Sequence, residues 1–258
     1  FTMHTMDIIF INYFPYKLVT AGVWDPYSFL KSNFPNYPFQ YYSPLTHFIF
    51  AFLQLLLKPF TPNSINSLYN TAVKWIFNQQ GYTVHYATIL HNYQLFRNLF
   101  ILKFPYLFFD FAIGGLFLKI IPNKEHALFS YKLWMLNPAV LHSCYAIGQY
   151  EIIPTFFLIL AVYLMIKKKN YYLTILFLVI GGATKILPFF LIPIVVILSG
   201  RNIRHKINLA IWALGIILFI YLPLYITSNG EVLNSLVVSS TVKLSGYFLS
   251  LKNLNLNF

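Results

Sequence analysis

The fold class is decided by residues 171–199, which read YYLTILFLVIGGATKILPFFLIPIVVILS. These 29 residues stand between two basic clusters, at 167–169 and 201–206. A spanning helix needs about 20 apolar residues, so the stretch is too long for one span and too short for two full ones. Gly181, Gly182 and Pro188 all disfavour a continuous helix. We therefore predict two short helices that form a re-entrant hairpin whose tip lines a cavity within or just above a membrane.

The composition of the whole chain agrees with a membrane protein. Of its 258 residues, 58% are hydrophobic and only 9% are charged, whereas soluble domains average about 25% charged residues. Further apolar stretches follow one another along the chain, at 99–118, 133–150, 152–166 and 207–226, with a weaker one at 232–251. The sequence therefore predicts an all-α, polytopic helical membrane protein.

The net charge of +12 has a topological explanation. Loops 119–132, 167–170 and 201–206 hold nine Lys and Arg residues in 24 positions, whereas residues 7–98 hold five in 92. Cytoplasmic loops are enriched in Lys and Arg, so we expect the three dense loops to be cytoplasmic, and we expect no nucleic-acid partner. Residues 1–98 then form one long extracytoplasmic loop, and residues 99–258 form the transmembrane domain.

Residues 45–57 are the exception that this topology must accommodate. They are apolar but short, and they contain His47 and Gln54. A crossing here would reverse the side of every later loop. We interpret the segment as an amphipathic helix in the outer interface, with a true crossing as the alternative.

Cysteine and histidine patterns indicate no metal site. Cys144 is the only cysteine, which excludes a disulfide framework and a cysteine-based metal site. The seven histidines show no HExxH or comparable spacing. We predict no metal ligands and no cofactor, and the need for a divalent cation stays open.

The scarcity of acidic residues makes each one informative. The chain has six of them, Asp7, Asp25, Asp110, Glu125, Glu151 and Glu231. The predicted topology puts Asp7 and Glu151 on the outer face, where they could share one site or be separate interfacial carboxylates. Glu125 and Glu231 are expected to be solvated loop and turn residues.

Other polar residues fall within apolar stretches, where an unpaired charge costs about 2.5–3.5 kcal/mol. Asp110 is therefore expected to face protein, with Asn137 as a candidate hydrogen-bond partner. Lys185, in the helix break of the hairpin, requires an anion, and a lipid phosphate would supply one; snorkelling is the alternative. His142 precedes Gln149 by two helical turns and could share its face, or could simply be packed in the core.

The central part of the sequence resembles a known family. Residues 134–154 read WMLNPAVLHSCYAIGQYEIIP, and residues 181–188 read GGATKILP. These stretches resemble membrane glycosyltransferases of the GT-C type, in particular prokaryotic mannosyltransferases related to GPI mannosyltransferase II. Looser matches are KFPYLFFD at 103–110, DIIF at 7–10, Gly22 and YYSPL at 41–45.

The resemblance implies an enzyme that transfers a hexose, most simply mannose, from a polyprenyl-phosphate donor to the hydroxyl group of a lipid or glycan acceptor, with inversion. It puts Asp7 in the position of the catalytic base. Lys185, Gln149, Glu151, His142 and Tyr42 are then expected to bind substrate. Glu151 departs from the family's usual aspartate by one methylene, and Tyr42-Ser43-Pro44 replaces the common Tyr-Pro-Pro.

The resemblance also implies a location. The active site would be extracytoplasmic, in the plasma membrane of a prokaryote or the endoplasmic reticulum of a eukaryote. The chain begins at Phe1 rather than Met and ends without a polar tail, so we expect a sequence cut at both ends, with the first span upstream of Asp7. A flippase for lipid-linked sugars, or another polytopic transporter, is the alternative function, because it would also need a broken hairpin and a lysine at membrane depth.

Overall fold

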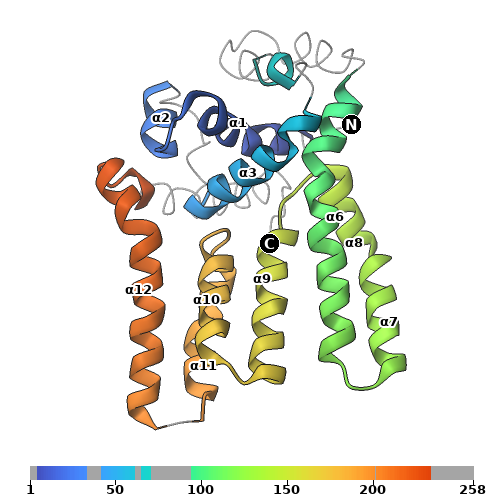
Figure 1. The fold of residues 1–258 in the computed structure, drawn as a ribbon, viewed down its shortest axis with the longest axis vertical. Coiled ribbons are helices and arrows are strands. Elements are labelled where there is room, and N and C mark those ends of the chain that lie inside the picture. Colours follow the sequence, from blue (N-terminus) through green and yellow to red (C-terminus); the bar gives the residue numbers. More distant parts are fainter. Residues whose placement is uncertain (1–4, 34–41, 62–64, 71–93, 201, 234–258) are drawn as a thin grey trace, which may run out of the picture.

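The computed structural model describes residues 5–33, 42–61, 65–70, 94–200 and 202–233, and all of its secondary structure there is helical. This confirms the all-α prediction. The helices fall into two parts: an outer layer of helices at one end of the molecule, and a bundle of helices that runs away from it (Figure 1).

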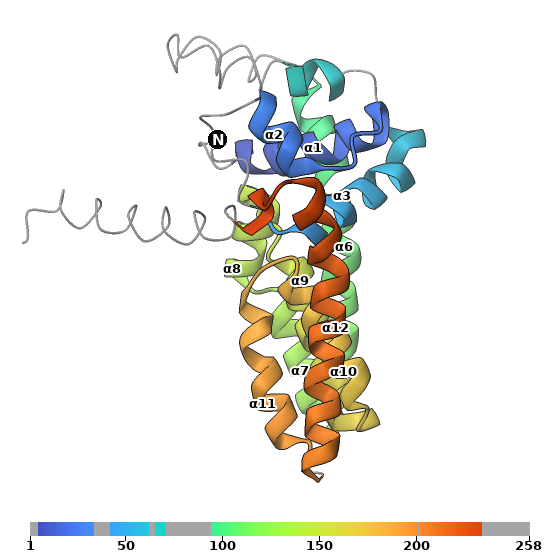
Figure 2. The same cartoon turned by 90° about the vertical axis from the view of Figure 1, so that its left-hand side faces the viewer.

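Among the described residues, the outer layer contains three helices and a short helical segment at 65–70. The helices are α1 (Thr5–Ala21), α2 (Pro26–Asn33) and α3 (Pro44–Leu57), which continues into the 3-10 turn η2 (Lys58–Phe60). Helix α1 packs on α3. Both lie across the end of the bundle, as the views from two sides show (Figures 1 and 2).

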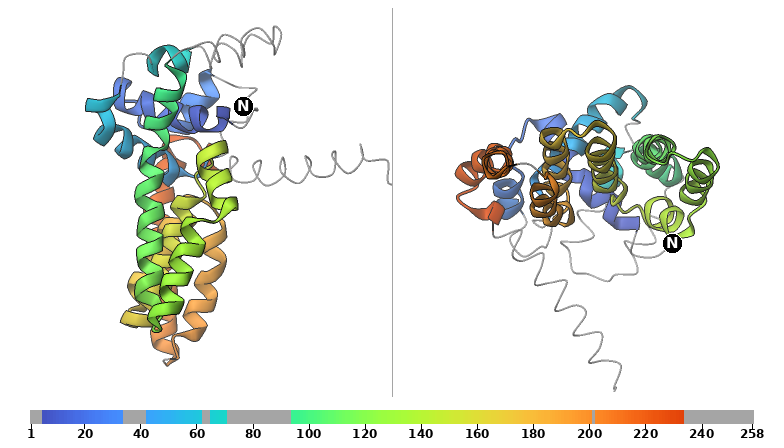
Figure 3. Two further views of the ribbon diagram at one scale, coloured as in Figure 1. Left: turned by 90° about the vertical axis from the view of Figure 1, so that its right-hand side faces the viewer. Right: turned by 90° about the horizontal axis from the view of Figure 1, so that it is seen from below.

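The bundle contains α6 (Leu95–Ile120), α7 (Lys124–Met135), α9 (Ile152–Tyr163), α10 (Tyr171–Gly182), α11 (Leu191–Leu198) and α12 (Ile203–Thr227). Contacts link α7 to α6, α6 to α9, α9 to α10 and α10 to α12. Seen from below, the helices form a shallow row with α7 and α12 toward its opposite ends (Figure 3). The turns that join α6 to α7, α9 to α10 and α11 to α12 all lie at the end of the bundle farthest from the outer layer (Figure 1).

The two parts share a hydrophobic core. Ile8 and Phe50 of the layer belong to the same buried cluster as Leu102, Tyr106 and Ile152 of the bundle. A second cluster, which includes Ile175, Val179 and Leu209, holds α10, α11 and α12 together. Burial of side chains from both parts in one cluster fixes the layer against the bundle.

Two described helices, α6 and α12, are long and apolar enough to cross a membrane. Helix length alone would also suit a buried core helix, but only 22% of the apolar window of α12 is buried. Phe219, for example, is 81% exposed. Apolar side chains exposed along most of a helix favour a lipid environment over water.

The two short helices predicted within 171–199, and the break between them, are present. Helix α10 ends at Gly182, a 3-10 turn η5 (Leu187–Phe190) follows, and α11 returns to the far end of the bundle. A Cβ atom on Gly182 would lie 2.5 Å from the Phe189 ring, so the close return of the chain requires glycine here. The tip of the hairpin points toward the outer layer (Figure 1).

The stretch 133–150 differs from the prediction of one continuous apolar segment. Residues 124–135 already form helix α7, so most of the expected loop 119–132 is helical. A new helix then begins at α8 (Pro138–Val140) and continues as the π-helix η3 (Leu141–Ile147). Pro138 and the Asn137 side chain, which accepts a hydrogen bond from the Ala139 N–H at 2.9 Å, start this second helix. The weaker stretch at 232–251 falls almost entirely outside the described residues.

Candidate functional site

The candidate site is built around the corner at residues 148–151, where η3 ends and α9 begins. Gly148 adopts a left-handed conformation with φ of 86°, which glycine accommodates without strain. The N–H groups of Gly148 and Gln149 both donate to the carbonyl oxygen of Ser143, at 3.0 and 2.9 Å. The corner therefore ends η3 and leads the chain into α9, with Glu151 as the residue before the first turn of α9.

Lys185, at the tip of the hairpin, forms an ion pair with Glu151. The two side chains are 24% and 37% exposed, respectively. The Lys185 ammonium also lies over the Tyr150 ring, 5.7 Å from its centroid, which is within cation–π range. The anion that the sequence requires for Lys185 is therefore supplied by the protein, and a lipid phosphate is not needed to balance this charge.

The outer layer holds the hairpin tip in place. The N–H of Leu45, in the first turn of α3, donates to the carbonyl oxygen of Ala183 at 3.2 Å. The buried hydroxyl of Thr46 donates to the carbonyl oxygen of Thr184 at 2.9 Å. The first turn of a helix has unpaired N–H groups and the last turn has unpaired carbonyls, so α3 and the end of α10 satisfy each other.

Aromatic side chains of the layer continue from this pair. The Tyr42 ring meets the Tyr150 ring edge to face, with centroids 5.8 Å apart, and lies 6.1 Å from the His47 ring. The Tyr27 hydroxyl donates to the Tyr42 carbonyl oxygen at 2.8 Å. These rings therefore form an aromatic group beside the Lys185–Glu151 pair.

His47 is buried among these rings. Its imidazole is 5.1 Å from the Phe14 ring and 6.0 Å from the Tyr27 ring, and neither ring nitrogen has a hydrogen-bond partner among the described residues. Burial lowers the pKa of His47 to about 3, because an apolar cage disfavours the charged imidazolium. The histidine is therefore neutral at physiological pH.

Lys103, on α6, is a member of this site that our sequence reasoning did not assign to it. Its ammonium donates to the carbonyl oxygens of Tyr145 and Ala146, at 2.7 and 3.2 Å, near the end of η3. A Cβ atom on Gly148 would lie 3.1 Å from both Lys103 Cε and Ile8 Cβ. In the sequence, only the resemblance of residues 103–110 to the GT-C glycosyltransferases points to this region.

The structure describes the other predicted site residues to different extents. Asp7 lies in the first turn of α1, beside Ile8, but its side chain lies outside the described part of the structure. Gln149 is half-buried at the corner. His142 is exposed within the π-helix, whose wider turn invalidates the α-helical spacing that predicted a face shared with Gln149.

Asp110 is buried, as expected, but its predicted partner is wrong. Its carboxylate accepts hydrogen bonds from the Trp134 indole N–H at 2.6 Å and from the Tyr145 hydroxyl at 2.8 Å. Asn137 instead caps α8. Asp110 thus holds α7 and η3 against α6, which is a structural role.

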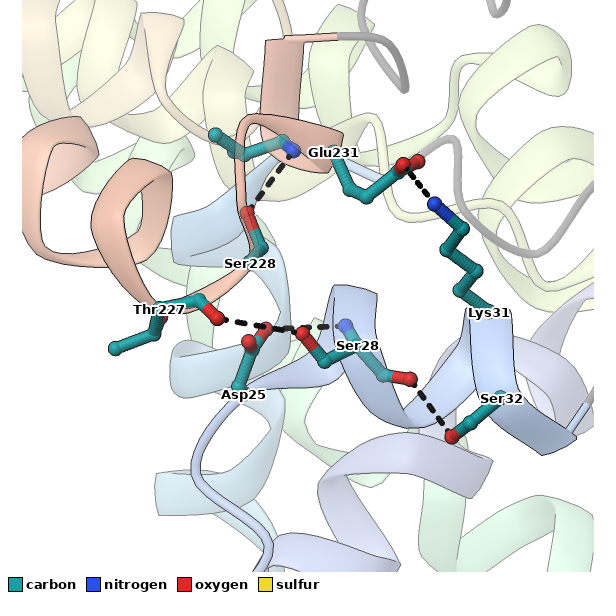
Figure 4. Close-up of polar contacts among 8 residues, drawn as sticks. Asp25, Ser28, Lys31, Ser32, Thr227, Ser228 and Glu231 are labelled. Atoms are coloured by element: carbon teal, nitrogen blue, oxygen red, sulfur yellow. Dashed lines mark hydrogen bonds and ion pairs between the residues drawn. The ribbon is translucent and has the colours of Figure 1, made fainter.

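Glu231 is also better connected than a solvated turn residue. It forms an ion pair with Lys31 of α2, and the Ser28 hydroxyl donates to the Thr227 carbonyl oxygen at 3.4 Å (Figure 4). Asp25 caps α2 by accepting from the N–H groups of Tyr27 and Ser28. This second polar cluster fastens the outer layer to the end of α12.

Comparison with models of protein families, with curated proteins and with solved structures gives no significant match. Within the described residues, no group of three or more His, Cys, Asp or Glu side chains could hold a metal ion.

Proposed function

We propose that this chain is a polytopic membrane glycosyltransferase of the GT-C type. It transfers a hexose, with mannose as the first candidate, from a polyprenyl-phosphate donor to an acceptor hydroxyl on the extracytoplasmic side. The observation that carries the proposal is the Lys185–Glu151 ion pair beside Tyr150 and Tyr42, at the junction of the outer layer and the bundle. A substrate with a membrane-embedded chain and a polar sugar requires a site at such a junction.

The orientation of the chain in the membrane supports an extracytoplasmic position for the site. The turns that carry the clusters of Lys and Arg lie at the far end of the bundle from this junction (Figure 1). Since basic loops mark the cytoplasmic side, the junction faces outward. The outer layer corresponds to the long first loop of the family, and α3 to its interfacial helix.

The proposed reaction is a displacement at the anomeric carbon of the sugar. The acceptor oxygen attacks the anomeric carbon while the bond from that carbon to the phosphate oxygen breaks, so the phosphate leaves with the electron pair and the configuration inverts. Asp7 accepts the proton of the acceptor hydroxyl, a role that typically contributes about 10²–10⁴-fold. Its position supports this assignment, because the adjacent Ile8 packs against Gly148 of the corner.

The other residues bind the sugar. Lys185 and Glu151 together present donors and acceptors to sugar hydroxyls, and Tyr42 and Tyr150 present aromatic edges. Gln149 adds an amide at the same corner. His142 is exposed on the adjacent π-helix, where it can contact the acceptor.

The test is a transfer assay with the full chain reconstituted in liposomes. Polyprenyl-phosphate [³H]mannose is added with a crude lipid acceptor fraction, and labelled product is separated from donor by chromatography. Glycosyl transfer predicts a new labelled product that is lost in a Glu151→Ala, Lys185→Ala variant. Movement of intact donor across the bilayer without a new product would instead identify the transporter alternative.

A further inference from the structure

Within the part of the chain that the structure describes, Lys103 has no carboxylate partner. Lys185 is neutralised by Glu151, whereas the Lys103 ammonium contacts only two carbonyl oxygens among the described residues. Carbonyl dipoles balance an ammonium less completely than a carboxylate does. Lys103 is therefore the more electropositive of the two groups.

We propose that Lys103 binds the phosphate group of a lipid-linked donor. This inference rests on the proposed function and reassigns the phosphate from Lys185 to Lys103. The ammonium has three N–H donors, of which two reach the carbonyls of Tyr145 and Ala146. The third donor is available for a phosphate oxygen, and a charge-assisted bond of this kind is about twice as strong as a neutral one.

The position of Lys103 relative to the corner supports this assignment. Its Cε atom lies 3.1 Å from where a Gly148 Cβ would be, and Ile8 is equally close on the other side. Asp7 directly precedes Ile8 in α1. A phosphate at Lys103 would thus lie near the Gly148 corner, which α1 approaches through Ile8, the residue that follows the proposed base.

The surroundings of Lys103 on α6 favour a lipid over free phosphate. Phe100 and Phe104 flank it in the helix, are 63% and 50% exposed, and have ring centroids 6.1 Å apart. A lysine whose neighbours on the helix are exposed apolar rings is complementary to an amphiphile with an anionic head. Free phosphate would use only the ammonium.

The test measures binding rather than transfer. The full chain is placed in nanodiscs of phosphatidylcholine, and equilibrium binding of radiolabelled farnesyl phosphate is compared with that of farnesol and inorganic phosphate. Lys103→Gln keeps hydrogen-bond donors for the carbonyls but removes the charge. We expect this variant to raise the Kd for farnesyl phosphate about tenfold and to leave the Kd for farnesol unchanged.

Two further variants make the result decisive. Lys103→Arg should restore most of the affinity, and Lys31→Gln, which removes a lysine of the outer layer that pairs with Glu231, should bind as the wild type does. Equal affinity of Lys103→Gln and wild type for farnesyl phosphate would overturn the proposal. So would an equal loss of farnesol binding, which indicates a purely structural role, or competition by inorganic phosphate as strong as that by farnesyl phosphate.

The outcome is separable from the test of the proposed function. If farnesyl phosphate binding depends on Lys103 but no sugar is transferred, the transferase proposal is contradicted and the phosphate-site proposal stands. If sugar is transferred and Lys103→Gln leaves the KM for the donor unchanged, the phosphate-site proposal is contradicted and the transferase proposal stands.

Discussion

Lys185 and Glu151, 34 residues apart in the chain, form an ion pair that joins the hairpin tip to the start of α9. The pair unites two features that the sequence singles out separately, a lysine in a helix break and a carboxylate at an external corner. It also changes the electrostatics of the site, because neither charge is available alone.

The strength of this pair can be measured by a double-mutant cycle. Glu151→Gln, Lys185→Gln and the double variant should give a coupling free energy of about 1 kcal/mol, since both side chains are partly exposed and solvent screens them. Unfolding by denaturant in detergent micelles provides the free energies. Additive effects would mean that the two side chains do not interact in solution.

Thr46→Val tests the connection between α3 and the hairpin tip. The change keeps the shape of the side chain but leaves the buried Thr184 carbonyl without its hydroxyl donor, at a cost of about 1–2 kcal/mol of unfolding free energy. Thr20→Val is the matched control, because the Thr20 hydroxyl makes an exposed bond within α1. If both variants lose the same stability, the Thr46 bond has no special role.

Gly148→Ala tests the close approach of α1 and α6 to the corner. An alanine at φ of 86° is strained, and its Cβ would press on Ile8 and Lys103, so we expect a loss of about 1–3 kcal/mol in unfolding free energy. Gly115→Ala, inside α6 with open space at its Cβ, should leave stability unchanged or raise it slightly. A well-tolerated Gly148→Ala would contradict the packing described for the corner.

His47 predicts a pH dependence of stability. Its pKa is about 3 in the folded chain and near 6.5 when unfolded, so the unfolded state takes up a proton first as the pH falls. The contribution of the neutral His47 to the free energy of unfolding is complete above pH 6.5. It falls toward pH 3 by about 1.4 kcal/mol per pH unit. Between pH 7.5 and 5, the free energy of unfolding of His47→Phe should therefore fall by about 2 kcal/mol less than that of the wild type. His126→Gln, at an exposed position, should follow wild type; a His47→Phe profile that matches wild type would disprove the neutral, caged histidine.

The elements that sequence reasoning predicted well are those fixed by local composition. Apolar stretches, the break at Gly181 and Gly182, and the clustering of basic loops at one end of the bundle each follow from residues close together in the chain. The break at Asn137 was missed because a short cap followed by Pro138 interrupts a stretch whose apolar composition continues unbroken.

The contacts that sequence reasoning missed depend on partners far apart in the chain or on irregular geometry. Asp110 binds Trp134 and Tyr145 because the helix break turns Asn137 away to cap the next helix. Lys103 reaches the end of a π-helix, which has no reliable sequence signature. Such pairings arise from tertiary packing and leave no periodic pattern.

Sugar transfer by an Asp7→Asn variant, compared with an Asp25→Asn control, tests the central claim most directly. Asparagine at position 25 still caps α2, so the control should transfer labelled mannose from polyprenyl phosphate at the wild-type rate. Asp7→Asn should reach the membrane in normal amounts and lose transfer by about 10²-fold or more, because the variant lacks the proposed base. Transfer near the wild-type rate in Asp7→Asn would contradict the account.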